Sequence, residues 1–355
     1  MRGGFFVGIS PQTGAMEDSM MMPAHPAATK WVDPPRRGAR ACLRRCARPF
    51  RSALASVNLS PLRYARIGVT EGGPVASIDI WPMPGGERPL FGASVWLDPS
   101  RLPPPVENTV YSNADGYGLD ASRMVARFKA ISEAMERWAF RVKGEDADRA
   151  HYGFDIDPTS NGMSAFPGLV PWRARDRAEL EALERFVLFS WWEGRLDAVE
   201  RASPWAGVRL LELDHGLGPF SVAVVHRTLP ESGLRLYGHG AGATLAGAAA
   251  GAYEEMLSHG TAVATFEQRG DFTRAAIDAL ANTFERRALF FATAEGQRLF
   301  DERLAAARWA DAKRPKVVFN GRVPGEWNRY AHVWRVTFEP VSTQYLDPRI
   351  DYFFW

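Results

Sequence analysis

The chain has 355 residues, of which 46% are hydrophobic and 24% charged, and its formal net charge at pH 7 is +2. These values are typical of a globular protein and exclude polyanion binding through overall charge. No segment approaches the roughly 18 consecutive apolar residues that a membrane-spanning helix needs, and no signal-peptide pattern is present. We therefore expect a soluble, cytoplasmic protein with one large domain or two and no membrane contact.

The first part of the chain is strongly basic. Residues 30–66 are rich in arginine and contain a single acid, Asp33. Such a segment is either an arm for nucleic acid or an acidic peptide, or a disordered leader. Met16, Met20, Met21 and Met22 precede it, so translation could also start after the first residue given. We favour the disordered segment. Residues 1–54 are therefore predicted to be basic and disordered, and residues 55–355 to form the folded domain. No nucleic-acid partner is expected.

Cys42 and Cys46 are the two cysteines of the chain. Two cysteines provide no disulfide framework. Their spacing on a helix could place both at one metal ion, but no histidine or second cysteine pair is near enough in the sequence to complete the roughly four ligands of zinc. We therefore predict free thiols.

The folded part is expected to begin with a β-hairpin. Arg66–Val69 and Val75–Ile80 alternate apolar and polar residues, and Glu71–Pro74 between them has the composition of a turn.

Three units follow, each consisting of a loop rich in glycine, serine or asparagine and then a helical pattern. The predicted loops are Ser112–Gly118, Pro158–Ala165 and Gly238–Ala243, and the predicted helices are 120–142, 173–191 and 244–259. Strands are expected at 208–213, 221–226, 317–319 and 332–337. Helices mixed with strands in this way predict an α/β fold.

The three helices share one template of four residues on one helical stripe. Two alanines permit close packing, a glutamate follows, and a basic residue comes last. The copies are Ala126, Ala130, Glu133 and Arg137; Ala174, Ala178, Glu181 and Arg185; and Ala248, Ala252, Glu255 and His259.

Glu133, Glu136 and Arg137 lie within one helical turn. Carboxylates suit Mg²⁺, which usually takes one or two of them together with phosphate oxygens and water, and an adjacent arginine can grip phosphate. The alternative is a pair that only stabilises a solvent-exposed helix, by about 0.2–0.5 kcal/mol.

The second helix repeats the triple as Glu181, Glu184 and Arg185. If the two helices face each other, four carboxylates and two arginines surround a common site, enough for two metal ions and a triphosphate. We infer this apposition from the repeat.

These motifs resemble the YcaO family. Gly118–Arg137 is similar to its first signature, a glycine loop and a helix that ends in Glu-x-x-Glu-Arg. Ser160–Ala165 followed by Glu181–Trp192 is similar to the second, and Gly238–Glu255 to the third. The resemblance covers roughly residues 60–340, with the motifs in the family's order.

The resemblance implies a YcaO-like fold, in which repeated glycine-loop and acidic-helix units pack on β-sheets around ATP and Mg²⁺. Family members activate the amide oxygen of a ribosomally synthesised peptide with ATP and form azolines by cyclodehydration, or thioamides or amidines. By this resemblance four residues would hold Mg²⁺: Glu133, Glu136, Glu181 and Glu184. Five would bind nucleotide: Arg137, Ser160, Asn161, Arg185 and Glu255. The resemblance assigns no catalytic residue in this chain.

The chain departs from the family pattern at Lys129, Arg173, Arg177 and Ser258. These departures leave open a second hypothesis, a YcaO-like scaffold that binds a peptide without hydrolysing ATP. A third hypothesis is an unrelated α/β protein with structural repeats. No winged-helix pattern precedes residue 60, so a separate leader-binding partner is expected where leader binding is needed, and a homodimer is left open.

Overall fold

The computed structural model describes residues 57–83, 89–103, 108, 110–270, 272–308 and 314–354. It combines helices with antiparallel sheets, which confirms the predicted mixture of α and β structure. The predicted basic segment 1–54, with Cys42 and Cys46, lies outside the described residues. Within the described part, none of the helices has the length and apolar character that crossing a membrane requires.

The first sheet has the antiparallel order β1-β2-β3. Its strands are β1 (Val75–Met83), β2 (Leu90–Leu97) and β3 (Gly116–Asp120), and the short helix α2 (Ser60–Arg63) precedes them. Helix α3 (Arg123–Glu145) packs on β3 and β2. Its N-terminus is capped by the Ser122 hydroxyl, which accepts a hydrogen bond from the Val125 amide.

The predicted N-terminal hairpin is wrong in one of its two strands. Val75–Ile80 is part of β1, but its partner is β2 and not Arg66–Val69. Gly68 and Val75 form an isolated parallel bridge, and Val69–Glu71 forms a 3-10 turn. Gly72 has φ +77, and the turn that it forms brings the first segment beside β1 only at Val75, whereas β2 pairs along the whole of β1.

The second sheet has the order β4-β10-β9, again antiparallel. Its strands are β4 (Met163–Phe166), β9 (Val317–Arg322) and β10 (His332–Phe338). Helix α4 (Trp172–Trp192) packs on β10 and β4. Its alanines Ala174 and Ala178 are fully buried, as the template predicts for residues that allow close packing.

The third sheet has the order β5-β6-β7-β8. Its strands are β5 (Asp197–Arg201), β6 (Arg209–Asp214), β7 (Ser221–Thr228) and β8 (Arg235–Gly242). Helix α5 (Leu245–Glu267) packs on β8 and β7 and continues two turns beyond the predicted end, because its buried apolar positions continue to Phe266.

The sequence predicts a glycine loop at 238–243, and this prediction is wrong because most of the segment belongs to strand β8. A Cβ atom at Gly238 would clash with the carbonyl oxygen of Ala252 on α5. Gly116 meets Ala130 of α3 in the same way on β3. The glycines therefore allow close contact between a strand and its helix.

Three further helices complete the chain: α6 (Arg274–Asp278), α7 (Thr283–Ala292) and α8 (Ala294–Ala305). The C-terminal segment returns to pack beside α4, where Tyr352 and Phe353 are almost fully buried. Arg287 of α7 fixes it by donating to the carbonyl oxygens of Tyr345 (2.8 Å) and Asp347 (2.9 Å).

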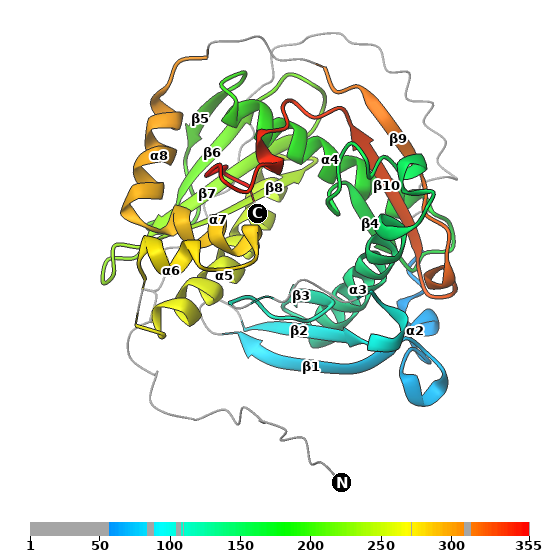
Figure 1. The fold of residues 1–355 in the computed structure, drawn as a ribbon. Coiled ribbons are helices and arrows are strands. Elements are labelled where there is room, and N and C mark those ends of the chain that lie inside the picture. Colours follow the sequence, from blue (N-terminus) through cyan, green and yellow to red (C-terminus); the bar gives the residue numbers. More distant parts are fainter. Residues whose placement is uncertain are drawn as a thin grey trace.

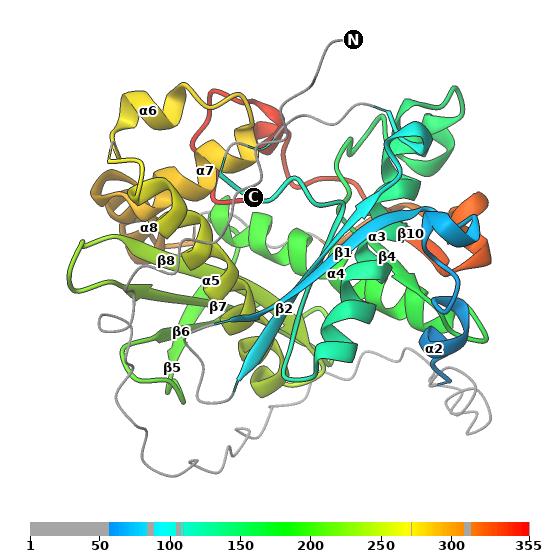
Figure 2. The same ribbon diagram turned by 90° about the horizontal axis from the view of Figure 1, so that it is seen from below.

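The three sheets, each with its long helix, are arranged around a central opening (Figure 1). Seen from below, β1 and β2 cross one side of the molecule in front of α3 and α4 (Figure 2). The buried apolar side chains form two large clusters, one around the third sheet and the C-terminal segment and one around the first sheet and α3. The long helices thus have apolar sides in the cores and other sides free to face the centre.

Candidate functional site

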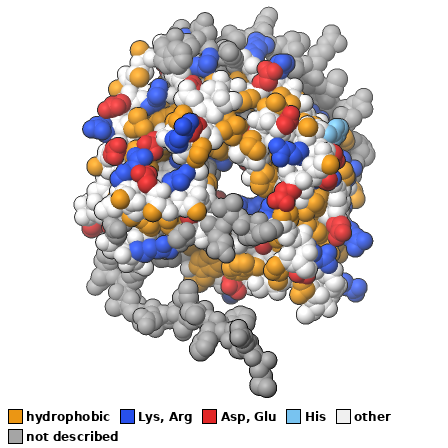
Figure 3. Space-filling view, viewed as in Figure 1, with side chains coloured by type: hydrophobic (Ala, Val, Ile, Leu, Met, Phe, Trp, Pro, Cys, Tyr) orange, Lys and Arg blue, Asp and Glu red, His pale blue; other side chains and the backbone are white. Residues whose placement is uncertain are grey.

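A cavity of about 1300 Å³ occupies the centre of the molecule. The space-filling view shows the molecule hollowed there (Figure 3). Its lining comes from all three strands of the first sheet, α3, β4 and the loop before it, α4, α5, the segment 110–114, α7 and the C-terminal segment. Most predicted site residues line it: Glu133, Glu136, Arg137, Ser160, Asn161, Glu181, Arg185 and Glu255. Glu184 is not among the lining residues.

Glu133 and Glu255 are held by the strand on which their own helix packs. The backbone amide of Tyr117 in β3 donates to Glu133 Oε2 over 3.0 Å, and the amide of His239 in β8 donates to Glu255 Oε2 over 2.6 Å. The two units are therefore alike in their hydrogen bonds as well as their sequences. Each carboxylate is fixed in direction by a backbone group that cannot rotate away.

Glu136 on α3 and Glu181 on α4 are close enough for their charges to interact. Burial and then the charges of Glu181 and Glu133 raise the pKa of Glu136 well above its ordinary value. Burial raises the pKa of Glu181 to about 8, with the charges of Glu184 and Glu133 adding to the effect and Arg185 opposing it. The structure therefore brings the two acidic helices together, as the repeat predicts.

Glu184 lies in a different network. His239 Nδ1 is 2.8 Å from Glu184 Oε1 and 3.1 Å from Glu255 Oε2, and the imidazole is almost fully buried. Burial favours a high pKa for Glu184, but the hydrogen bond and charge of His239, together with Arg185, outweigh it and lower the pKa. His239 therefore bridges two of the predicted acids, a role that no motif in the sequence indicates.

The two arginines of the motifs differ in their surroundings. Arg137 donates from Nε (3.0 Å) and Nη2 (2.7 Å) to Glu133 Oε1, and half of its side chain is exposed. Arg185 contacts the ring of His239 through Nη1 (2.9 Å to Nε2), and its guanidinium carbon lies 4.9 Å from the centre of the Phe354 ring. Arg137 is therefore available to a ligand, and Arg185 is held by the protein.

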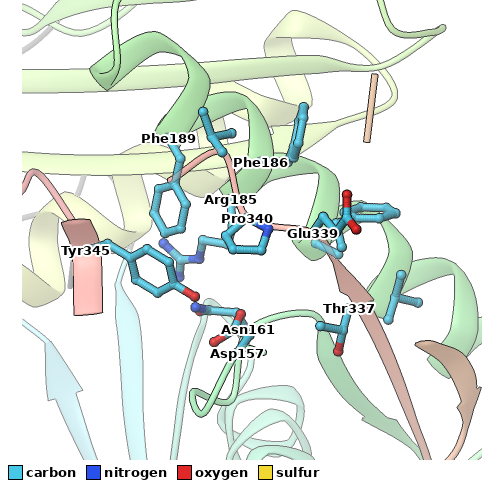
Figure 4. Close-up of a pocket in the computed structure, with 13 residues that line it drawn as sticks. Asp157, Asn161, Arg185, Phe186, Phe189, Thr337, Glu339, Pro340 and Tyr345 are labelled. Carbon is cyan, nitrogen blue, oxygen red and sulfur yellow. The ribbon is translucent and has the colours of Figure 1, made fainter. Parts of the chain in front are cut away.

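Arg185 also separates the central cavity from a much smaller one. This second cavity has a volume of about 30 Å³, room for about one or two water molecules. Figure 4 shows Arg185 beside Asn161, Asp157 and Tyr345 at its wall. The Nε atom of Arg185 is buried and has no hydrogen-bond partner among the described residues.

The loop that carries Ser160 and Asn161 is rigidly held. Gly162 adopts φ +66, and a Cβ there would clash with the carbonyl oxygen of Val336. Arg335, which is fully buried, donates to the carbonyl oxygens of Thr159 (2.8 Å) and Asp157 (2.6 Å). The loop can therefore present its polar groups to the cavity without a change of backbone.

Lys129, a departure from the family pattern, is engaged within the protein. Its Nζ donates to the Leu119 carbonyl oxygen over 2.7 Å and lies 3.0 Å from Asp120 and 3.8 Å from Glu254. It therefore links the end of β3 to α5, and much of its charge is compensated there.

Ser258, another departure, also lines the cavity, and its hydroxyl donates to the Glu254 carbonyl oxygen over 3.3 Å. The His259 that follows is structural: Nδ1 accepts from the Tyr237 amide and Nε2 contacts the Ala288 carbonyl oxygen, both over 3.0 Å. Burial lowers the pKa of His259 to about 4, so this ring is neutral at pH 7.

Tyr111 is a cavity residue that no motif in the sequence marks. Its hydroxyl is buried without a hydrogen-bond partner among the described residues, and burial raises its pKa. Glu285 Oε1 fixes its backbone by accepting from the amides of Val110 (2.6 Å) and Tyr111 (2.7 Å). A tyrosine beside a polar loop is the available signal, and it is too common to be specific.

The donor set fits Mg²⁺ bound with a nucleotide better than a free metal ion. Within the described residues, no group of three or more His, Cys, Asp or Glu side chains is placed to hold a metal by itself. Magnesium with a nucleotide needs only one or two carboxylates, because phosphate oxygens and water complete its shell. Glu133, Glu136 and Glu181 supply such groups at the cavity wall.

No protein-family model matches the chain, and no curated protein is similar to it. Chains of similar fold are found among solved structures, and they include the following two. YcaO from Methanopyrus kandleri, bound with AMPPCP and Mg²⁺, has a TM-score of 0.48 at 15% identity and matches 81% of this chain and 91% of its own. A heterocyclase in complex with substrate and cofactor has a TM-score of 0.48 at 12% identity and matches 79% of this chain and 51% of its own. At such values neither likeness assigns a role to a residue of this chain.

Proposed function

We propose that the central cavity binds ATP with Mg²⁺ and that the protein activates backbone amides of a ribosomally synthesised peptide, in the manner of a YcaO protein. The observation that carries the proposal is the convergence of Glu133, Glu136 and Glu181 with Arg137 on one large cavity. Charged carboxylates this close repel one another and raise one another's pKa. A bound divalent ion would offset this repulsion.

Within this proposal the residues have separate tasks. The three glutamates would hold Mg²⁺, and Arg137 would exchange part of its bond with Glu133 for a phosphate oxygen. The Ser160–Asn161 loop would contact the nucleotide, and Arg185 and Glu184 would support the wall through His239. When bound, ATP would supply the phosphoryl group that activates the amide oxygen for azoline or thioamide formation.

Calorimetry with ATP and Mg²⁺ tests the proposal. We expect wild type to bind and the double variant Glu133→Gln, Glu181→Gln to bind at least about a hundredfold more weakly, because two anionic ligands are lost. Glu179→Gln is the matched control, since Glu179 lies on α4, pairs with Arg175 and does not line the cavity. Equal loss in the control, or wild-type affinity in the double variant, would contradict the proposed site.

A second candidate function is a YcaO-like scaffold that binds peptide without hydrolysing ATP. The observation that favours it is the position of His239 between Glu184 and Glu255, which leaves fewer acids open to a metal than the motifs suggest. Phosphate release from ATP in the presence of candidate peptides distinguishes the two. Nucleotide binding with no release, or no nucleotide binding by folded wild type, supports the scaffold.

A further inference from the structure

Four arginines lie near one another beside the acidic site. They come from three elements: Arg63 from α2, Arg173 and Arg177 from α4, and Arg322 from β9. We call them the arginine cluster. His332 of β10 lies with them, since its Nδ1 is 3.2 Å from Arg322 Nη2.

The sheet and the α2 segment explain how residues so far apart in sequence meet. His332 pairs directly with Phe166 in the β4–β10 ladder, so the two side chains share one face. The guanidinium carbons of Arg173 and Arg177 lie 5.7 Å and 5.4 Å from the centre of the Phe166 ring. The Leu59 amide donates to the Pro167 carbonyl oxygen over 2.9 Å and holds α2 against the loop after β4.

In the described part of the chain, no carboxylate is paired with the cluster. Among the described residues, none of its four arginines forms an ion pair with a carboxylate, and Arg63 Nη1 is buried without a hydrogen-bond partner. The charge of Glu136 acts on Arg177 and raises its pKa, but within the described residues the two side chains form no ion pair. Like charges held together without acids oppose folding, so an anionic ligand would relieve them.

The pKa directions agree with this view. Desolvation and then the charge of Arg173 lower the pKa of Arg177. Desolvation, followed by the charges of Arg63 and Arg322, lowers the pKa of His332. The charged forms of Arg177 and His332 are therefore both disfavoured by neighbouring arginines.

The form of the cluster favours an extended ligand over a single phosphate. Arg177 lines the central cavity, whereas Arg322 is exposed on the outer surface, so the positive charge continues from the inside to the outside. Two apolar side chains beside the cluster, Leu62 and Leu169, are 75% and 51% exposed. A peptide with acidic and apolar side chains can use both kinds of contact.

The chain's own N-terminal part is a poor occupant, because residues 30–66 are themselves rich in arginine. We propose that the arginine cluster binds an acidic segment of a separate peptide at the entrance to the central cavity. The cluster adjoins the acidic nucleotide site, because Arg177 lines the same cavity, but none of its residues is among the proposed ligands of Mg²⁺ or nucleotide. The proposal does not depend on nucleotide binding.

Fluorescence anisotropy tests the proposal, with a labelled synthetic peptide in which glutamate and leucine alternate, in buffer without nucleotide or Mg²⁺. We expect it to bind wild type about tenfold more tightly than the same peptide with glutamine for glutamate, and more weakly as salt is raised. The variant Arg173→Gln, Arg177→Gln is expected to lose about tenfold in affinity, and Arg63→Gln to lose affinity in the same direction.

Arg175→Gln is the matched control, because Arg175 lies on the same helix and faces Glu179. The variant Glu133→Gln, Glu181→Gln should keep the peptide affinity, which separates this proposal from the one for nucleotide. Equal binding of the glutamate and glutamine peptides, or unchanged affinity in the double arginine variant, would overturn it. Displacement of the peptide by inorganic phosphate at a similar concentration would also overturn it and identify a phosphate site.

Discussion

Helices α3 and α4 carry the same triple of two glutamates and an arginine but place it in different surroundings. On α3, Arg137 binds Glu133 of its own helix and half of its side chain is exposed. On α4, Arg185 and Glu184 both contact His239, and Phe354 lies against the guanidinium. The α3 half is open to a ligand. The α4 half, apart from Glu181, which lines the cavity, is closed by β8 and the C-terminal segment. Two equal motifs therefore need not have equal roles.

The largest effect is expected from His239→Ala, which would open the closed half. The substitution leaves Glu184 and Glu255 without their shared partner in a buried place, which should cost about 3–5 kcal/mol of unfolding free energy. Urea denaturation measures this. In a double-mutant cycle with Glu184→Ala, we expect the double variant to cost less than the sum of the single ones. Simple additivity would show that the bridge does not couple the two residues.

The next largest effect is a dependence of stability on pH, which we expect from Glu181 between the two halves. The folded pKa of Glu181 is about 8, above its unfolded value, so the native state holds a proton that the unfolded state releases. Wild type should therefore lose stability as pH rises from about 4.5 to 8. At pH 8, Glu181→Gln should be more stable than wild type by about 1–3 kcal/mol, and at pH 5 nearly equal to it.

Urea denaturation at both pH values checks this prediction. Glu179→Gln keeps Glu181, so its stability relative to wild type should be the same at pH 5 and pH 8. A Glu181→Gln variant that is less stable than wild type at pH 8 would mean that the carboxylate is charged and well compensated in the native state.

A smaller effect separates the two arginines. Arg137→Gln should weaken ATP binding with Mg²⁺ about tenfold, while the unfolding free energy changes by no more than about 0.5 kcal/mol, because its ion pair is half exposed. Arg185→Gln should show the opposite pattern, a loss of about 1–2 kcal/mol in stability with little change in affinity. Calorimetry and urea denaturation give both quantities. Equal effects of the two variants on affinity would remove the distinction between open and closed halves.

The smallest effect is expected from Tyr111→Phe. Removing a buried hydroxyl without a partner should change stability by no more than about 0.5 kcal/mol. If that hydroxyl meets the ligand, ATP affinity should fall about threefold to tenfold. Tyr330→Phe, outside the cavity lining, serves as the control. Unchanged affinity in Tyr111→Phe would exclude the hydroxyl from the binding site.

The sequence predicts the three long helices and the sheet strands β6, β7, β9 and β10 well, because apolar spacing and β-branched residues are local signals. The prediction of a glycine loop fails because Gly238 and Gly240 lie in strand β8, where they allow close packing and do not form a turn. The sequence also fails to predict the partner of β1, since pairing depends on segments that are distant along the chain.

For the site, the repeat in the sequence is enough to predict that Glu133, Glu136 and Glu181 meet, and all three line one cavity. Their predicted roles with Mg²⁺ and nucleotide remain predictions, as does the domain boundary near residue 55. The bridging role of His239 could not be predicted, because it depends on a side chain from another unit. The arginine cluster was equally hidden, since Arg63 and Arg322 lie at opposite ends of the folded chain.

The pairing of bare glycine with alanine has a consequence for how the site could evolve. At these glycines no side chain separates β3 from α3, or β8 from α5. Contact between the two backbones therefore sets the distance between each helix and its strand. This distance allows the Tyr117 and His239 amides to donate hydrogen bonds to Glu133 and Glu255. A larger residue at Gly116 or Gly238 would lift a carboxylate out of reach without touching it, so these glycines determine the site as surely as the acids do.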